Sequence, residues 1–119
     1  MSLSIQDHEV GDVTVVRVAG RLTLSDSNGA VKNAVNTLVE QGRNRFVLNL
    51  EGVPYVDSSG LGELASAHVT VTRTGATLVL TAVNDRVMEA LKLTKLTRVL
   101  QIEQDEAAAV ARVQQAGMA

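Results

Sequence analysis

Cysteine is absent from this chain, and aromatic residues make up only 2% of it. Without cysteine there is no disulfide framework, no thiolate nucleophile and no cysteine-based zinc site. Phe46 and Tyr55 are the only aromatic rings, so base stacking is almost ruled out as a way of binding nucleic acid. A folded core must therefore be built from Val, Leu, Ile and Ala.

The chain also lacks an excess of positive charge. Its 11 Lys and Arg residues stand against 13 Asp and Glu residues, which gives a net charge of -2. Proteins that bind nucleic acid or an anionic membrane usually carry a basic patch, and this balance does not supply one. Two small basic clusters, Arg43 with Arg45 and the group Lys92, Lys95 and Arg98, are interpreted as solvated faces.

Long hydrophobic runs are missing as well. No apolar stretch approaches the roughly 20 residues that a membrane-spanning helix needs. The first residues, MSLSIQDHEV, have neither the basic region nor the apolar region of a secretory signal. We therefore expect a soluble, cytoplasmic protein. The 119 residues contain no repeat, low-complexity tract or linker, which predicts one domain over residues 1–119.

The spacing of apolar residues predicts several β-strands. Leu3 and Ile5 alternate with polar residues, residues 11–12 make a turn, and residues 13–19 are rich in valine. This pattern predicts two strands or a hairpin at the start of the chain. Three later apolar runs are short enough to be buried strands, and they cover residues 46–50, 78–82 and 99–102.

Helices are predicted between and after these strands. In the most regular one, apolar residues follow the helical spacing from Val31 to Val39. Ser25 or Ser27 can cap its start, and Gly42 can end it in a left-handed conformation. The other three helices are predicted to begin at Asp57, at Asn84 or Asp85, and among the acids Glu103, Asp105 and Glu106.

The second of these helices has a rival interpretation. The segment VTVTRTGATLVLT at 69–81 alternates like a hairpin, and its β-branched residues favour a strand locally. We prefer a helix that ends at Gly75, because two neighbouring parallel strands require a crossover helix. The order of elements then predicts an α/β domain with a mixed, mostly parallel sheet of about four or five strands, flanked by about four helices.

The segment VPYVDSSGLGEL at 53–64 joins a predicted strand to the second helix. Asp57 is a good N-cap, and the serines at 58–59 take the first helical positions. Gly60 and Gly62 weaken the helix by about 1 kcal/mol each, but they leave its backbone open to an approaching molecule. A plain capping sequence explains any one of these residues. Their combination indicates an exposed site that can be chemically modified.

Enzymatic interpretations of this segment are weaker. The run GLGELA at 60–65 matches the dinucleotide pattern G-x-G-x-x-A, but no acid follows the next strand to hold a ribose. Ser58 lacks the preceding glycine of G-x-S-x-G, because Val56 stands there. Its base would have to be His68, on the apolar stripe of its own helix, or the isolated His8. No His, Asp and Glu cluster has metal-ligand spacing, so we expect no enzyme, metal or cofactor.

The motif DSSGLG at 57–62, after an apolar strand and a short loop, resembles the phosphorylation motif of STAS-domain anti-sigma factor antagonists. The likeness extends to the length, the order of elements, the turn GRL at 20–22 and the run at 46–62. It implies that Ser58 is phosphorylated by a partner serine kinase, which binds the ATP and is also the anti-sigma factor. The unmodified chain would bind that kinase and free a sigma factor. Phosphorylation would abolish binding, and a PP2C-type phosphatase would restore it.

We expect the partner surface to surround this serine. Glu63, Ser66 and Thr70 are predicted to form the exposed face of the same helix, with Thr23 on a neighbouring loop. Many relatives carry an acid where this chain has Thr23. An alternative role is that of a STAS subunit in a signalling or lipid-transport assembly, without a sigma factor. The residues expected at the partner surface are Asp57, Ser58, Ser59, Gly60, Gly62, Glu63, Ser66 and Thr23.

Overall fold

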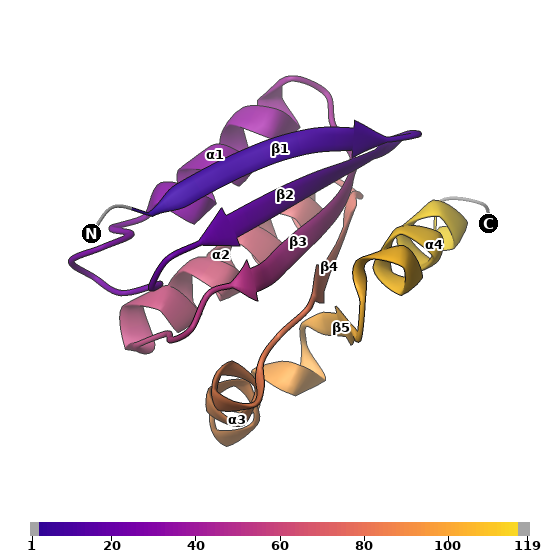
Figure 1. The fold of residues 1–119 in the computed structure, drawn as a ribbon. Helices are drawn as coiled ribbons and strands as arrows, with labels where there is room; N and C mark the ends of the chain where they lie inside the picture. The colour runs from indigo at the N-terminus through magenta and orange to yellow at the C-terminus, as the bar shows by residue number, and fades with distance from the viewer. Residues whose placement is uncertain (1–2, 117–119) are drawn as a thin grey trace.

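A five-stranded sheet forms the centre of the structure, a computed structural model that describes residues 3–116 (Figure 1). The strands lie side by side in chain order. β1 and β2 form an antiparallel hairpin, and every later pair is parallel, so the predicted mixed, mostly parallel sheet is confirmed. The strands are β1 (Ser4–Val10), β2 (Val13–Ala19), β3 (Arg45–Gly52), β4 (Thr77–Thr81) and β5 (Gln101–Glu103).

The helices cover both faces of this sheet (Figure 1). α1 and α2 lie together on one face, α4 packs on the other, and α3 lies at the end of the sheet near β5. None of the helices within residues 3–116 is long and apolar enough to cross a membrane. Their bounds are α1 (Ala30–Glu40), α2 (Ser58–Arg73), α3 (Asp85–Leu93) and α4 (Glu106–Ala116), and a short 3-10 helix, η1, covers Leu96–Arg98.

Each central strand buries both of its faces. In β2, Val16 and Val18 face the core under α1 and α2, whereas Val13 and Val15 face the smaller core under α4. Successive strand residues point to opposite faces, so a strand covered on both sides must be apolar throughout. This explains why the strands appear in the sequence as continuous apolar runs.

The helix predicted between β3 and β4 is present, and the rival hairpin is wrong. α2 continues to Arg73, and Gly75 turns the chain with a φ of +81°. The Thr72 hydroxyl donates to the His68 carbonyl oxygen at 2.9 Å, so a residue with low helix propensity satisfies its polar group within the helix. Packing of α2 on the sheet outweighs the local preference for strand, which is weak.

Two predicted boundaries are wrong. The first helix begins at Ala30, and its N-cap is Gly29, with a φ of 85° and no side-chain cap, so neither Ser25 nor Ser27 caps it. The last strand covers Gln101–Glu103 rather than 99–102, because Val99 still belongs to the turn that closes η1. Of the two caps predicted for α3, Asn84 is the one observed, because its Oδ1 accepts from Val87 N at 2.8 Å. At the start of α4, where acids were predicted, Asp105 accepts from Ala108 N at 2.8 Å.

Candidate functional site

Asp57 fixes the first turn of α2. As the predicted N-cap it accepts a hydrogen bond from Gly60 N through Oδ1 at 2.9 Å. Its other oxygen, Oδ2, accepts from Leu24 N at 3.1 Å, in the loop before α1. The hydrogen bond from Gly60, assisted by those from Leu24 and Ser59 and opposed by partial desolvation, holds the pKa of this carboxyl below its ordinary value. Asp57 is therefore ionised at neutral pH and joins two segments.

Ser58 occupies the first helical position and is exposed, whereas the adjacent Ser59 is half-buried. No hydrogen bond occupies the Ser58 hydroxyl among residues 3–116. Asp57, Ser58 and Ser59 thus lie together where α2 begins, as predicted. An exposed hydroxyl beside free N–H groups of a helix start can carry an anionic group, because the helix dipole favours negative charge there.

The two glycines of this turn have different reasons to be glycine. Gly60 is buried, and a Cβ on it would lie only 2.0 Å from the Leu22 carbonyl oxygen. Gly62 is exposed, and a Cβ there would meet nothing within 4 Å. The prediction that Gly60 opens the helix backbone to a partner is therefore corrected: its missing side chain lets α2 pack against its own chain. Only Gly62 presents bare backbone at the surface.

The loop between β2 and α1 is tied to the start of α2. Leu22 forms an isolated parallel bridge with Val56. Its N–H donates to the Tyr55 carbonyl oxygen at 3.0 Å, and its own carbonyl accepts from Asp57 N at 3.1 Å. With the bond from Leu24 to Asp57, these contacts place residues 22–24 directly beside the α2 N-terminus.

Glu63 is not on an exposed face, contrary to the prediction. Its residue is 6% exposed, and its Oε1 accepts from Val31 N at 3.0 Å in the first turn of α1. Its Oε2 accepts a short hydrogen bond from the Ser27 hydroxyl. Since α1 has no side-chain cap of its own, Glu63 supplies one from the neighbouring helix. A buried carboxylate needs such partners, so its position is explained by the fold of this chain.

The remaining predicted contact residues are also less open than expected. Thr23 is 9% exposed, and its hydroxyl donates to Asp26 Oδ2 at 3.0 Å. Asp26 in turn pairs with Arg21 at 3.0 Å, so this part of the loop is internally bonded. Ser66 and Thr70 are half-buried.

Two features of the segments that lead to α2 and contact its first turn were not predicted. Leu24 is 65% exposed although it is a large apolar residue, and its N–H is held by Asp57. Before the helix, the guanidinium of Arg86 from α3 lies 4.7 Å from the centroid of the Tyr55 ring, a cation–π contact. The sequence alone does not indicate that Leu24 is exposed, because an apolar residue in a loop looks the same in the sequence as an apolar residue of the core. It does not indicate the contact of Tyr55 with Arg86 either, because the two residues are far apart in the chain.

The geometry does not support the enzymatic interpretations. His68 lies ten residues along α2 from Ser58, which is about 15 Å along the helix axis, too far for a base. His68 is half-buried, as predicted for a packing residue, and its Nδ1 has no hydrogen-bond partner among residues 3–116. Within residues 3–116 no group of three or more His, Cys, Asp and Glu residues could hold a metal ion.

Comparison with known proteins agrees with the observed fold and with the family resemblance of the sequence. Residues 4–109 match the family model described as the STAS domain. A candidate anti-sigma factor antagonist of Thermotoga neapolitana is 27% identical over 105 residues, which is 88% of this chain and 93% of that protein.

Solved structures have the same fold. An anti-sigma factor antagonist from Mycobacterium paratuberculosis superposes with a TM-score of 0.85 at 20% identity, covering 94% of each chain. The Bacillus cell fate determinant SpoIIAA, in its phosphorylated form, gives a TM-score of 0.69 at 20% identity and covers 92% of this chain and 99% of its own.

Proposed function

The chain belongs to the STAS domain family, and on this premise we propose that it is an anti-sigma factor antagonist switched by phosphorylation of Ser58. In the unmodified form it binds an anti-sigma factor that is also a serine kinase, and a sigma factor is released. The kinase binds the ATP and transfers its γ-phosphoryl group to the Ser58 hydroxyl, which weakens binding. A PP2C-type phosphatase removes the phosphate. The chain itself catalyses no step.

The exposure of Ser58 at the start of an intact helix carries this proposal. A kinase must bring the hydroxyl oxygen into line with its bound nucleotide, so the acceptor has to be accessible and free of competing hydrogen bonds. Ser58 meets both requirements, whereas Ser59 is half-buried. A chain of the same fold, SpoIIAA, has been solved in unphosphorylated and phosphorylated forms, which is consistent with a fold that survives the modification.

The electrostatics of the turn favour a switch of binding rather than of folding. A phosphate adds a charge of about -1.5 to -2 at a helix N-terminus, where the dipole tolerates it. Asp57 is already ionised next to it, so the modified turn presents a dense negative charge to the partner. If a surface shaped for a neutral hydroxyl loses about 3 kcal/mol in meeting this charge, affinity falls roughly a hundredfold.

The contact surface extends beyond Ser58. Leu24 is an exposed apolar side chain on a loop that is bonded to Asp57, the residue before Ser58. Tyr55, three residues before Ser58, contacts the guanidinium of Arg86. Aromatic and arginine residues are enriched among the side chains that dominate binding energy, and an exposed leucine suits an apolar pocket. Gly62 leaves room for close approach.

The experiment that tests the switch uses two adjacent serines. The purified chain is incubated with ATP and the histidine-kinase-like anti-sigma factors of its source organism, and phosphate is mapped by mass spectrometry. Ser58→Ala should abolish incorporation, and the matched control Ser59→Ala should leave it within about twofold, since its hydroxyl is half-buried. Phosphate on Ser59 or on neither serine contradicts the proposal.

Binding is measured on the kinase that modifies the chain. The unmodified chain and Ser58→Ala should both capture it, whereas Ser58→Glu should capture it at least tenfold less, because even a single negative charge disturbs the neutral site. Release of sigma factor from its complex with the kinase should follow the same order. If Ser58→Ala and Ser58→Glu capture the kinase equally, a charge at Ser58 does not control binding. The proposed switch is then wrong, although the fold is correct.

A further inference from the structure

The outer edge of β5 is open. β5 is the last strand of the sheet and pairs only with β4, so half of its backbone N–H and C=O groups lack a strand partner within residues 3–116. A groove of about 520 Å³ lies along this strand, between α3, η1 and α4. It is far from the Ser58 turn in the chain, and its use does not depend on the phosphorylation switch.

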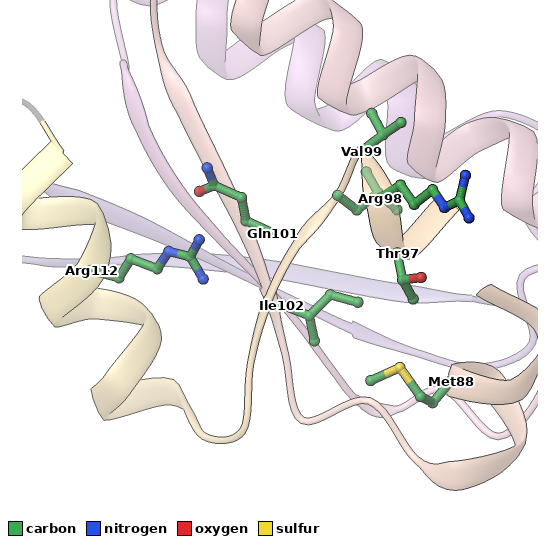
Figure 2. Close-up of a pocket in the computed structure, with 8 residues that line it drawn as sticks. Met88, Thr97, Arg98, Val99, Gln101, Ile102 and Arg112 are labelled. Atoms are coloured by element: carbon green, nitrogen blue, oxygen red, sulfur yellow. The ribbon is translucent and has the colours of Figure 1, made fainter. Parts of the chain in front are cut away.

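The groove joins apolar and cationic side chains (Figure 2). Arg112 and Gln101 lie on one side of β5, and Met88 and Ile102 lie on the other, as the alternation of side chains along a strand requires. Val99 also lines the groove and is 54% exposed, so it adds apolar surface there.

The cations of the groove are available to a ligand. Arg98 forms no ion pair among residues 3–116. Arg112 Nη1 donates to Glu103 Oε2 at 2.7 Å, which orients the guanidinium but leaves its other N–H groups free to bind a second carboxylate. An incoming carboxylate would therefore meet a positioned donor.

We infer that this edge docks an extended, acidic segment of a partner protein, which adds to the sheet as a further strand beside β5. Backbone hydrogen bonds to the free edge supply affinity, and alternate side chains supply specificity. The segment would alternate, with carboxylates toward Arg112 and apolar side chains toward Met88 and Ile102. Arg98 lies on the same side as Met88 and Ile102, and its charge adds to the positive potential of the groove. A lipid surface fits less well, because it would leave the backbone groups of the edge unpaired in an apolar medium.

The probe is the synthetic peptide acetyl-GEVEVEG-amide, added to the full-length, ¹⁵N-labelled chain and followed by NMR. The amide signals of 99–103 should move, and Arg98→Glu combined with Arg112→Gln should weaken binding at least tenfold. The control Lys32→Glu reverses a charge on α1 and should change binding by less than twofold. Thermal unfolding of each variant verifies that it is folded, and both arginines are exposed, so their replacement should be tolerated.

Two further peptides test separately the charge of the bound segment and its backbone hydrogen bonds. The lysine peptide acetyl-GKVKVKG-amide should not bind, since it presents the wrong charge. The acidic peptide with N-methyl groups on alternate residues should bind at least tenfold more weakly, because it cannot complete the ladder. Equal binding of either control peptide overturns the proposal. So does the absence of shifts at 99–103, or charge-dependent binding to phosphatidylglycerol vesicles without peptide binding.

Discussion

The two glycines in the first turns of α2 should respond in opposite directions to the same substitution. Gly60→Ala places a Cβ 2.0 Å from the Leu22 carbonyl oxygen and 2.8 Å from its carbonyl carbon. Real Cβ atoms keep at least about 3.0 Å from such atoms, so one backbone segment must move by roughly 1 Å. Gly62→Ala places its Cβ in open space.

The size of each effect follows from these surroundings. For Gly60→Ala, overpacking costs about 1–3 kcal/mol. Moving Leu22 also weakens the 3.1 Å bond from Asp57 N, worth about 1 kcal/mol. Helix propensity returns at most about 1 kcal/mol, so we expect a net loss of about 2 kcal/mol. Gly62→Ala meets no clash and should gain about 0.5–1 kcal/mol.

Urea and thermal unfolding followed by circular dichroism measure both variants against the wild type. An unfolding entropy of about 2.1 cal/mol/K per residue, over 119 residues, corresponds to about 4 °C per kcal/mol. Gly60→Ala should therefore lower Tm by about 8 °C, and Gly62→Ala should raise it by about 2–4 °C. A Gly60→Ala variant as stable as the wild type would refute the packing argument, and a destabilised Gly62→Ala would show that its surface is not open.

Four further substitutions, at three residues, separate the roles of the site residues. Asp57→Ala should cost about 1 kcal/mol at pH 7. Folding lowers the pKa of Asp57 below its ordinary value of 3.8, so this contribution is present above that pH. Urea unfolding should show the difference between variant and wild type shrinking as the pH falls through the lowered pKa. Glu63→Ala should cost about 2–3 kcal/mol in the same assay, because it leaves the Val31 N–H and the Ser27 hydroxyl without a hydrogen-bond partner. Glu63→Gln keeps an acceptor and should cost about 1 kcal/mol less than Glu63→Ala. Leu24→Ala should leave stability within about 0.5 kcal/mol and weaken kinase capture about tenfold in a pull-down titration, and unchanged capture would remove Leu24 from the contact surface.

The order of strands and helices along the chain could be predicted because each element is set by a pattern that is local in sequence. Strands buried on both faces show as apolar runs, and the helices between them show as a period near four residues. Asp57 was found as an N-cap because capping depends on the next three residues alone, and the bond to Gly60 confirms it. The role expected for Ser58 came from the resemblance of the motif at 57–62 to the phosphorylation motif of the family, and it stays a prediction.

Glu63 could not be placed from the sequence because its partner lies 32 residues away, at the start of α1. Local reasoning assigned the α1 cap to nearby serines and the acid to a solvated face, and both assignments were wrong for the same reason. A signal was present, however: Gly60, Glu63, Ala67 and Val71 are all buried and follow one another at helical spacing. A stripe of small residues interrupted by one acid indicates a helix packed closely on another helix, with the acid directed at a backbone donor.

The contacts that hold the first turn of α2 leave the Ser58 side chain out. Asp57 binds Gly60 and Leu24, Gly60 rests on Leu22, and Glu63 joins the helix to α1 through backbone and side-chain donors. A charge added to Ser58 therefore breaks none of these bonds, and the helix dipole offsets part of its cost. The same contacts keep Leu24 beside the modified turn, so the charge appears next to an apolar contact that has not moved. Binding can then change while folding stability does not, which is the physical requirement for a reversible switch on a domain of this size.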